Sequence, residues 1–470
     1  MQFKSVILSA IVAGAMLAGC SQPAAEQGPI RTEVPPRPEG ATDLVGFAAD
    51  PIDTVRIGVI GLGMRGSSAV ERLSHVPGAK VVAICDIDSA RVNRSAEALE
   101  RLGAPKAEAY FGTDTAWYAL TDNPNVDLVY VVTDWENHYP MAMRAMEQGK
   151  HVAIEVPAAM NLDEIWGLID TAERTQRHCM MLENCVYDFF EMNTLNMTQQ
   201  GLFGEVLHTE GSYIHNLSDF WDEYADDWRM KYNQTHRGDV YPTHGMGPAC
   251  QLLDIHRGDR MTTLVAMDTK AVSGPEFLVS DRGANPDSVQ YANGDHTMTM
   301  IRNANGKTIH IQHDVVNPRP YSRMYQLTGT RGFANKYPVE GYAFMPEALD
   351  SASTPDYQNL SSHNFISADQ REALMEKYTH PIISEVGEVA KKVGGHGGMD
   401  YIMDYRLIYC LRNGLPLDMD VYDLAEWCAL GPLTAISIEN GSAPVEVPDF
   451  TRGAWDKVKG YRHAFATDPK

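Results

Sequence analysis

The stretch that decides the fold is VRIGVIGLGMRG, residues 55–66. Its first half, Val55–Ile60, is a short apolar run of the kind that forms a buried strand. A helical pattern follows the glycines through Leu73, and a second apolar run, 80–85, ends on Asp86. Strand, glycine-rich turn, helix, strand and acid in this order are the pattern of a dinucleotide-binding βαβ unit.

Each glycine of this turn has a separate physical task. Gly61 allows the tight turn, Gly63 lets the backbone approach a pyrophosphate, and Gly66 allows the helix to pack closely on the strand. The helix N-terminus favours the phosphate charge, and Asp86 can accept hydrogen bonds from the adenosine ribose. The pattern therefore predicts bound NAD, and the alternative is a tight βα turn that binds nothing.

Strands and helices continue to alternate after this unit. Apolar runs predict strands at 126–132, 151–155 and 180–184, and periodic stretches predict helices at 140–148 and 162–176. The alternation predicts an α/β fold whose first domain, residues 54–185, is a Rossmann domain with a doubly wound parallel sheet. Ligands bind beyond the carboxyl ends of such strands, which here carry residues 134–138, 155–157 and 183–184.

From about residue 190 the pattern changes to longer strands, several with period-two alternation. Such strands are predicted at 205–215, 296–302, 307–316 and 325–329. We expect a second, α+β domain over residues 186–450, with an open, largely antiparallel sheet and the substrate site. Helices predicted near 380–393, 400–412 and 420–438 should pack across both domains, and residues 451–470 should form a C-terminal tail.

The first twenty residues have the features of an export signal. Lys4 precedes a mostly apolar run, Val6–Leu17, which is too short to span a bilayer comfortably. The run ends in LAGC, residues 17–20, and resembles a bacterial lipoprotein lipobox in which Cys20 carries the lipid; the alternative is an ordinary signal peptide. Residues 21–53, rich in Pro, Ala, Gly and Glu, are expected to be a flexible tether. Ser21 after the cysteine resembles the sorting pattern of exported proteins anchored at the bacterial outer membrane or cell surface.

Composition narrows the classes of partner. The formal net charge of -23 argues against sequence-independent binding to nucleic acid, which requires basic surface. The cysteines other than Cys20 are scattered and lack the Cys/His spacing of a zinc site, so we expect buried small side chains and no metal. An exported protein can form disulfides, so one disulfide among these cysteines remains an alternative. Formation of a homo-oligomer is also left undecided by the sequence. These cysteines are 85, 179, 185, 250, 410 and 428.

The order of strands and the segment Glu155-Val156-Pro157 resemble the glucose–fructose oxidoreductase and inositol dehydrogenase superfamily. The resemblance implies a Rossmann domain followed by a mixed α/β sheet domain. The usual segment of that superfamily is Glu-Lys-Pro, whose lysine assists hydride transfer from a sugar hydroxyl. Position 156 is Val here, and this departure disfavours a simple sugar dehydrogenase.

A narrower resemblance accounts for the departure. Several segments between about residues 55 and 450 are similar to glycoside hydrolase family 109, which is typified by α-N-acetylgalactosaminidase. These segments are GLGMRG at 61–66, WENH at 135–138, LEN at 182–184, residues 196–210, GDVYPTHG at 238–245 and NPRPYSR at 317–323. The resemblance implies that bound NAD⁺ takes hydride from C3 of a terminal sugar and that the acidified C2 proton is removed as the C1 substituent departs. Water addition and return of the hydride then complete the cycle, so paired carboxylates at the glycosidic bond are not needed.

The resemblance also implies site residues. Those expected at the NAD are Met64, Arg65, Asp86, Trp135, His138, Glu155, Val156 and Asn184, together with the three glycines of the turn. Those expected at the carbohydrate or terminal glycan substrate are Tyr213, Arg229, Tyr241, His244 and Tyr321, and Tyr325 stays open. His244 and Tyr241 are the catalytic candidates, since imidazole exchanges protons near neutral pH.

Structural alternatives accompany these residues. His244 could lie in an ordinary loop, Tyr213 in the core, Arg229 in a surface ion pair and Trp135 in packing beside the nucleotide. His396, inside the glycine-rich stretch 394–398 ahead of Asp400, either lines the cleft or caps a helix. At the level of function, a net NAD-dependent sugar oxidoreductase and a non-catalytic glycan-binding lipoprotein remain as alternatives to the glycosidase.

Overall fold

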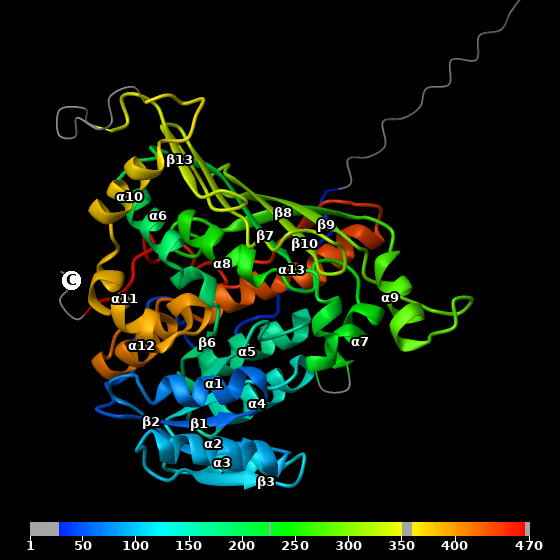
Figure 1. The fold of residues 1–470 in the computed structure, drawn as a ribbon, viewed down its shortest axis with the longest axis vertical. Coiled ribbons are helices and arrows are strands. Elements are labelled where there is room, and N and C mark those ends of the chain that lie inside the picture. Colours follow the sequence, from blue (N-terminus) through cyan, green and yellow to red (C-terminus); the bar gives the residue numbers. More distant parts are fainter. Residues whose placement is uncertain (1–27, 225–226, 350–359, 466–470) are drawn as a thin grey trace, which may run out of the picture.

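The computed structural model describes residues 28–224, 227–349 and 360–465, and two β-sheets dominate it (Figure 1). A six-stranded sheet forms the N-terminal half and an eight-stranded sheet forms most of the C-terminal half. Helices lie between the two sheets, as expected of an α/β protein in layers.

The N-terminal sheet is parallel throughout, with the strand order β3-β2-β1-β4-β5-β6. This is the order of a dinucleotide-binding Rossmann sheet, so the predicted fold class is confirmed. The edge strand β3 was missed because it is short and exposed and lacks the apolar run of its neighbours. The strands are β1 (Val55–Ile60), β2 (Ala79–Asp86), β3 (Glu108–Phe111), β4 (Leu128–Val131), β5 (His151–Ile154) and β6 (Cys179–Met181).

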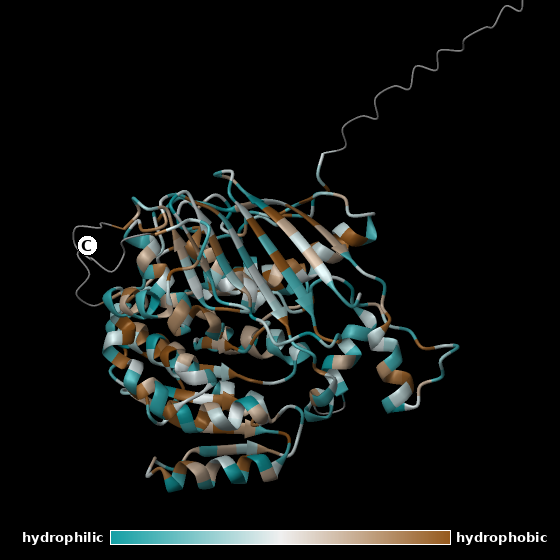
Figure 2. Cartoon of the chain, turned by 45° about the horizontal axis from the view of Figure 1, so that its top comes forward, coloured by the Kyte–Doolittle hydropathy of each residue, from teal (hydrophilic) through white to brown (hydrophobic). Residues whose placement is uncertain are grey.

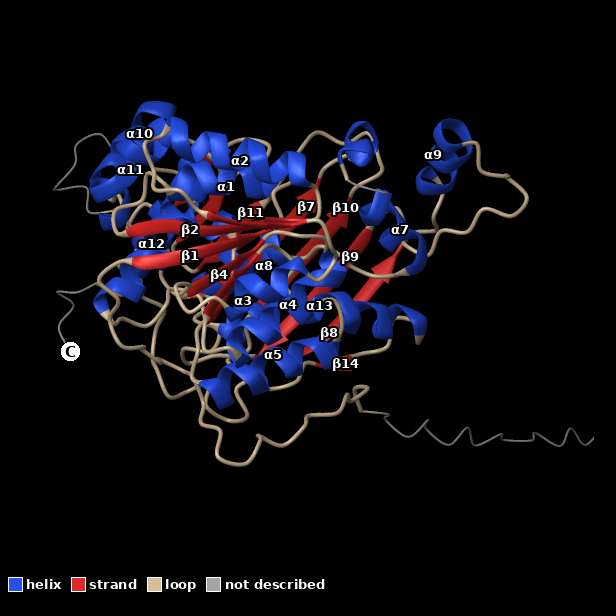
Figure 3. Cartoon of the chain, turned by 90° about the horizontal axis from the view of Figure 1, so that it is seen from below, coloured by secondary structure: helices blue, strands red, loops and turns tan. Residues whose placement is uncertain are grey.

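Five helices cover this sheet on its two faces (Figure 3). The predicted start of the fourth helix, Pro140, is wrong, because the helix begins at Trp135. The carboxylate of Asp134 accepts a hydrogen bond from the backbone N–H of Asn137 and caps that earlier start. The helices are α1 (Met64–Leu73), α2 (Ser89–Arg101), α3 (Ala116–Asp122), α4 (Trp135–Glu147) and α5 (Leu162–Thr175).

The second sheet has the order β13-β12-β11-β7-β10-β9-β8-β14, and only the β10–β7 pair is parallel among the described strands. The largely antiparallel sheet is therefore confirmed. Hydrophilic and hydrophobic residues are mixed along its strands (Figure 2), and burial alternates most regularly in β9, where Thr299 and Ile301 are buried and Met298 and Met300 are exposed. The strands are β7 (Val206–Ile214), β8 (Met261–Asp268), β9 (Thr297–Asn303), β10 (Thr308–Asp314), β11 (Tyr325–Gly329), β12 (Gly332–Asn335), β13 (Gly341–Phe344) and β14 (Val445–Glu446).

The helices after the Rossmann domain connect the two sheets. The long helix α13 contacts both α5 and β8, and α12 contacts α1, as predicted for helices that pack across both domains. Five shorter helices, α6 to α10, lie in segments whose sequence predicted no element. The helices are α6 (Phe189–Gln199), α7 (Trp228–Thr235), α8 (Thr243–Leu252), α9 (Ser273–Arg282), α10 (Ala368–Lys377), α11 (Pro381–Val393), α12 (Met399–Asn413) and α13 (Val421–Glu439).

Residues 28–53, the described part of the expected tether, lie along the folded body. Ile30 forms a parallel bridge with Val445, and the guanidinium of Arg37 pairs with Glu173 at 2.8 Å. Leu44 is buried and its N–H donates to the Tyr422 hydroxyl. The expected C-terminal tail is also packed up to residue 465, where Tyr461 and His463 are buried. The domain boundaries themselves stay predictions.

The signal peptide, the lipobox and Cys20 lie outside the described residues. Within the described part of the chain, the helices are all too short or too polar to cross a bilayer. The six described cysteines are buried and free, which agrees with their interpretation as small core side chains; the disulfide left open by the sequence is not formed among them.

Candidate active site

The glycine turn has the shape that a dinucleotide requires. Gly61 has φ +91°, and a Cβ there would collide with the carbonyl oxygen of Val132. A Cβ on Gly66 would overlap the carbonyl oxygen of Gly61, so both positions need glycine. At Gly63, which caps α1, the nearest atom to an added Cβ is 4.0 Å away, and this open side lets a phosphate approach the helix N-terminus. The residues present therefore fit an NAD pyrophosphate.

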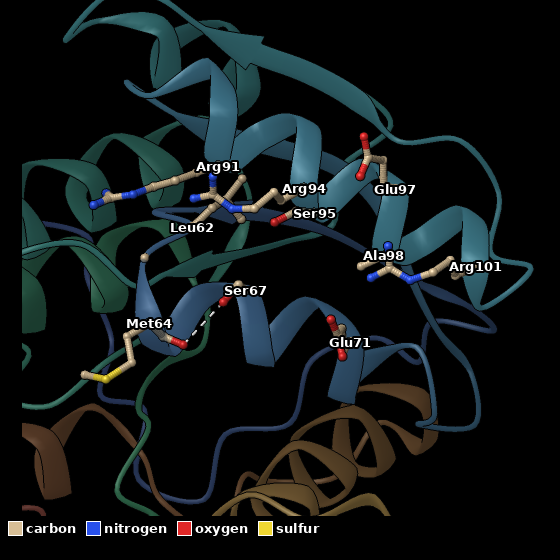
Figure 4. Close-up of a pocket in the computed structure, with 11 residues that line it drawn as sticks. Leu62, Met64, Ser67, Glu71, Arg91, Arg94, Ser95, Glu97, Ala98 and Arg101 are labelled. Carbon is tan, nitrogen blue, oxygen red and sulfur yellow. Dashed lines mark hydrogen bonds between the residues drawn. The ribbon is translucent and has the colours of Figure 1, made fainter. Parts of the chain in front are cut away.

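Asp86 ends β2 beside this turn, as predicted. Its carboxylate accepts hydrogen bonds from the N–H of Leu62 at 2.7 Å and of Asp88 at 2.9 Å. Arg91 lies 3.7 Å away from the same carboxylate. A cavity of about 570 Å³ opens next to these residues between α1 and α2 (Figure 4). The α2 side supplies Arg91, Arg94, Arg101 and Glu97 and the α1 side supplies Met64 and Glu71, so the lining has three cations against two carboxylates.

Two of the predicted NAD residues, Arg65 and Asn184, are held by an acid that the prediction omitted. Arg65 pairs with Glu155 at 2.9 Å and with Asp400 at 3.0 Å, and the Asn184 amide donates to Asp400 at 2.6 Å. The ring of His396 approaches the same carboxylate at 3.0 Å. Burial raises the pKa of Asp400, but His396, Arg65 and Arg72 outweigh it and hold the pKa well below its usual range. The C-terminal helix α12 thus fixes side chains of the Rossmann domain at the mouth of the nucleotide site.

The remaining predicted NAD residues lie close by with different surroundings. Trp135 is buried and its ring stacks on Tyr241 at 5.8 Å, so it joins the nucleotide side to the second domain. His138 is buried between the carbonyl oxygens of Pro157 and Thr133, at 2.8 and 3.1 Å, where it supports the strand-end loops. Val156 is 8% exposed and offers no proton acceptor where the superfamily places lysine.

The two catalytic candidates form a chain with a buried glutamate. The Tyr241 hydroxyl lies 3.3 Å from Nε2 of His244, and Nδ1 of His244 lies 2.7 Å from a carboxylate oxygen of Glu183. His244 is in the first turn of α8, not in the loop that was its alternative, and Glu183 follows the end of β6. A base, a hydroxyl and an orienting carboxylate are therefore aligned in one buried row.

Burial sets the charges of this row. It lowers the pKa of His244, and the neighbouring Glu183 only partly offsets this effect, so the imidazole is neutral near pH 7. Burial would raise the pKa of Glu183, but the contact with His244 outweighs it and the carboxylate is ionised. Cys185 also lies close, since Glu183, Cys185 and His244 each bring one potential metal-ligating atom within 4.8 Å of the others. Burial raises the pKa of the Cys185 thiol well above its usual value, so the thiol is protonated at neutral pH.

Arg229 and Tyr213 complete the buried part of the site. The Arg229 guanidinium lies 4.5 Å from the centre of the Tyr241 ring and 5.7 Å from that of Tyr213. One of its nitrogens donates to the Tyr224 hydroxyl at 2.8 Å, while Nη2 makes no hydrogen bond within the described part of the chain. Arg229 is 6% exposed and forms no ion pair with a described residue, so it is not the surface residue that was its alternative. Instead a buried cation with an unsatisfied donor lies beside the tyrosines.

Tyr321 lies at the outer end of the same group. Its side chain is 41% exposed and Arg323, from the same segment, lies 5.6 Å from its ring centre. Nη1 of Arg323 lies 3.2 Å from the sulfur of Cys185, and its Nε has no partner among the described residues. Tyr325, by contrast, is 3% exposed and packs edge-on against Phe190, so it is a core residue.

Four residues of this site were not chosen from the sequence: Glu183, Arg323, His396 and Asp400. Glu183 and Arg323 lie within LEN and NPRPYSR, two of the segments that resemble the family. Their place in these segments was the only indication in the sequence that they belong to the site. The glycine-rich stretch before Asp400 pointed to His396 without deciding its role. Only the fold places α12 against α1 and brings both residues to Arg65.

Comparison with known families divides the chain between β6, the last strand of the first sheet, and β7, the first strand of the second sheet. Residues 55–183 match the oxidoreductase family with an NAD-binding Rossmann fold, and residues 187–457 match the C-terminal domain of glycosyl hydrolase 109. The glycosyl hydrolase family 109 protein 1 of Phocaeicola vulgatus is 60% identical over 97% of this chain and 98% of its own length. The family 109 protein of Porphyromonas gingivalis is 62% identical over 93% of both chains.

Solved structures share the fold at low sequence identity. Levoglucosan dehydrogenase in complex with NADH and levoglucosan aligns with a TM-score of 0.61 and 19% identity, covering 84% of this chain and 100% of that chain. The apo scyllo-inositol dehydrogenase of Lactobacillus casei aligns with a TM-score of 0.57 and 13% identity, over 84% of this chain and 99% of that chain. These similarities establish the two-domain architecture and leave the chemistry to the site residues.

Proposed function

Because the chain belongs to glycosyl hydrolase family 109, we propose that it hydrolyses terminal α-N-acetylgalactosaminides through a redox cycle on bound NAD. The observation that carries the proposal is the buried row Tyr241–His244–Glu183, next to a nucleotide site whose lysine position is occupied by Val156. An NAD-using carbohydrate enzyme follows from the family and the fold. The sugar and the cycle are the proposed part.

The side chains of the site suit removal of a proton from carbon. When bound, NAD supplies a hydride acceptor for C3 of the sugar and later a donor, and an oxidised C3 makes the C2 proton acidic. His244 is neutral and buried, so Nε2 can accept that proton, and the carboxylate of Glu183 stabilises the imidazolium that forms. The Tyr241 hydroxyl at 3.3 Å can protonate the oxygen that leaves C1.

The buried guanidinium groups suit the charge that develops during this step. Removal of the C2 proton places negative charge on the oxygen at C3, and a preorganised cation in a dry site stabilises such an oxyanion. Arg229 lies against Tyr241, and Nη2 of Arg229 and Nε of Arg323 each lack a hydrogen-bond partner among the described residues.

The test is hydrolysis of nitrophenyl N-acetyl-α-galactosaminide in D₂O without added cofactor, with nitrophenol and NADH absorbance followed together. We expect sugar release, no net NADH and one deuterium at C2 of the product. His244→Ala should keep its bound NAD but lose turnover by about 10²–10⁴-fold, while the exposed control His363→Ala keeps both.

Three results would contradict the proposal in different ways. Product without deuterium at C2 would exclude the elimination route. Stoichiometric NADH would indicate a net sugar oxidoreductase, and glycan binding without turnover would indicate a non-catalytic lipoprotein.

We further propose that the protein is exported and anchored by lipid on Cys20 at the outer membrane or cell surface, as the lipobox LAGC suggests.

A further inference from the structure

A row of aromatic rings leads from the buried catalytic pair towards the surface. The ring centre of Tyr213 lies 4.6 Å from that of Tyr241 and 5.4 Å from that of His244. Its hydroxyl lies 3.1 Å from Nδ1 of His215, and the His215 ring continues the row at 5.8 Å. The row therefore starts at the atoms that carry the proposed chemistry.

The outer end of the row is open to solvent. The His215 ring lies 4.9 Å from Tyr321 and 5.4 Å from Phe220, and Tyr337 lies 6.2 Å from Tyr321. Tyr321 and Phe220 are 41% and 40% exposed, whereas Tyr213 and Tyr241 are each 6% exposed. Large aromatic side chains that stay exposed beside a buried site mark a surface for a ligand.

Backbone contacts hold the outer rings together. His215 directly follows β7, and Phe220 stands in the short 3₁₀ helix η2 (Ser218–Glu223) that comes next. Ile214 and Ser322 exchange two backbone hydrogen bonds of 2.9 Å, which fix the loop of Tyr321 to the end of β7. The rings thus come from segments whose relative position is set before a ligand arrives.

We propose that Phe220, His215, Tyr321 and Tyr337 form a subsite for the sugar residue on the leaving-group side of the scissile bond. The proposal rests on the proposed function, since it takes the terminal sugar to lie at Tyr241 and His244. A sugar joined to that terminal residue extends along the row towards the solvent. One face of a pyranose is lined by C–H groups and buries its apolar area on an aromatic ring.

The charge state of the row agrees with this occupant. Burial, with Arg229 and Arg323, lowers the pKa of His215 to about 4, so its ring is neutral at neutral pH. A neutral aromatic surface suits the neutral, amphipathic ring of a hexose. The buried end supplies charge and proton transfer, and the open end supplies apolar contact, so the two ends serve different parts of one oligosaccharide.

The test compares two glycosides of the same terminal sugar on the full protein. Methyl N-acetyl-α-galactosaminide has no sugar to place in the subsite, whereas N-acetylgalactosamine α-linked to galactose does. Phe220→Ala should lower kcat/KM for the disaccharide about five- to tenfold, mainly through KM, and change the methyl glycoside less than about twofold. Tyr337→Ala should act in the same direction, and Tyr118→Ala, a truncation of an exposed side chain of α3, should change neither substrate.

An equal loss on both substrates, or no change on either, would overturn the subsite. Failure of the proposed function has a different signature, because the wild-type protein would then release no sugar from either glycoside. In that case calorimetric binding of the uncleaved disaccharide and methyl glycoside decides between the outcomes. The subsite is supported if Phe220→Ala binds the disaccharide more weakly than the wild-type protein does but binds the methyl glycoside equally well. It is overturned if the two proteins bind the disaccharide equally well.

Discussion

Nδ1 of His244 lies 2.7 Å from the carboxylate of Glu183, although the two residues are 61 positions apart in the sequence. An ionised carboxylate accepts a hydrogen bond and cannot donate one, so the contact favours the tautomer with its proton on Nδ1. Nε2 is then free to accept a proton on the side of Tyr241. Glu183 is therefore a positioning residue that decides which nitrogen of the imidazole faces the substrate.

Replacement of Glu183 should affect the pH dependence as well as the rate. In Glu183→Gln the negative charge is lost, which removes an interaction that raises the pKa of His244. The acid limb of the kcat profile should move to lower pH, and kcat should fall by about tenfold or more because the imidazolium loses its partner. Measurement of kcat against pH, with NAD content as the check on folding, tests both effects. Glu388→Gln on the exposed face of α11 is the control; an unshifted acid limb in Glu183→Gln would contradict the positioning role.

The nucleotide site should prefer NAD to NADP. Asp86 would repel a 2′-phosphate, and it also engages the nearest cation, since Arg91 lies 3.7 Å away. Asp86→Ser should weaken NAD binding and raise the affinity for NADP, because Arg91 is released to pair with the phosphate. The further change Arg91→Ala in the Asp86→Ser variant should remove the gain in NADP affinity. Titration of both cofactors into the cofactor-free variants measures the ratio, and tighter NADP binding by the wild-type protein would reject the prediction.

Stability should fall in mild acid because several histidines are buried in the neutral form. Burial lowers the pKa of His313 to about 3 and that of His463 to about 4, against an unfolded value near 6.5. The unfolded chain therefore binds more protons below pH 6.5, and each such histidine costs about 1.4 kcal/mol of stability per pH unit down to its folded pKa. Above pH 6.5 they add no pH dependence.

The histidine prediction is tested by denaturant unfolding at pH 7 and pH 5. His463 lies against Tyr461 and His380, and neither of its ring nitrogens has a hydrogen-bond partner in the described residues. His463→Phe should therefore reduce the loss of unfolding free energy between the two pH values by about 1–2 kcal/mol. His363→Phe on the surface is the control, and an unchanged pH dependence in His463→Phe would refute the assignment.

The proposed location at the membrane rests on the lipobox. Cys20→Ala should leave the protein without lipid and move it from the membrane fraction to the soluble fraction, since a diacylglyceryl group supplies the two chains that stable anchoring needs. Fractionation after a salt wash, together with metabolic labelling by fatty acid, measures the change. Retention of the variant in the membrane pellet would show that another feature holds the protein there.

Local patterns were sufficient for most strands of the Rossmann domain. Buried parallel strands have continuous apolar runs, so β1 and β2 could be predicted from neighbouring residues. The role of Gly61 could be predicted in the same way, because the turn at 61–66 leaves no space for a Cβ at that position. The strands β7, β9, β10 and β11 were predicted from longer runs, several with period-two alternation, which is clearest in the burial of β9 and β10. Short edge strands such as β3 and β14 carry too few residues for a period to be recognised.

The composition of the site, in contrast, depends on contacts that have no local pattern. The sequence alone determined the nucleotide turn, the missing lysine at Val156 and the presence of a tyrosine and a histidine three positions apart. The tertiary structure decided that Glu183 orients His244, that Asp400 holds Arg65 and Asn184, and that Tyr321 lies beside His215 in the aromatic row. The reason is physical: a hydrogen bond or a ring contact needs atoms within a few ångströms of each other, and for residues this far apart in the chain only the packing of the two sheets and α12 sets that distance.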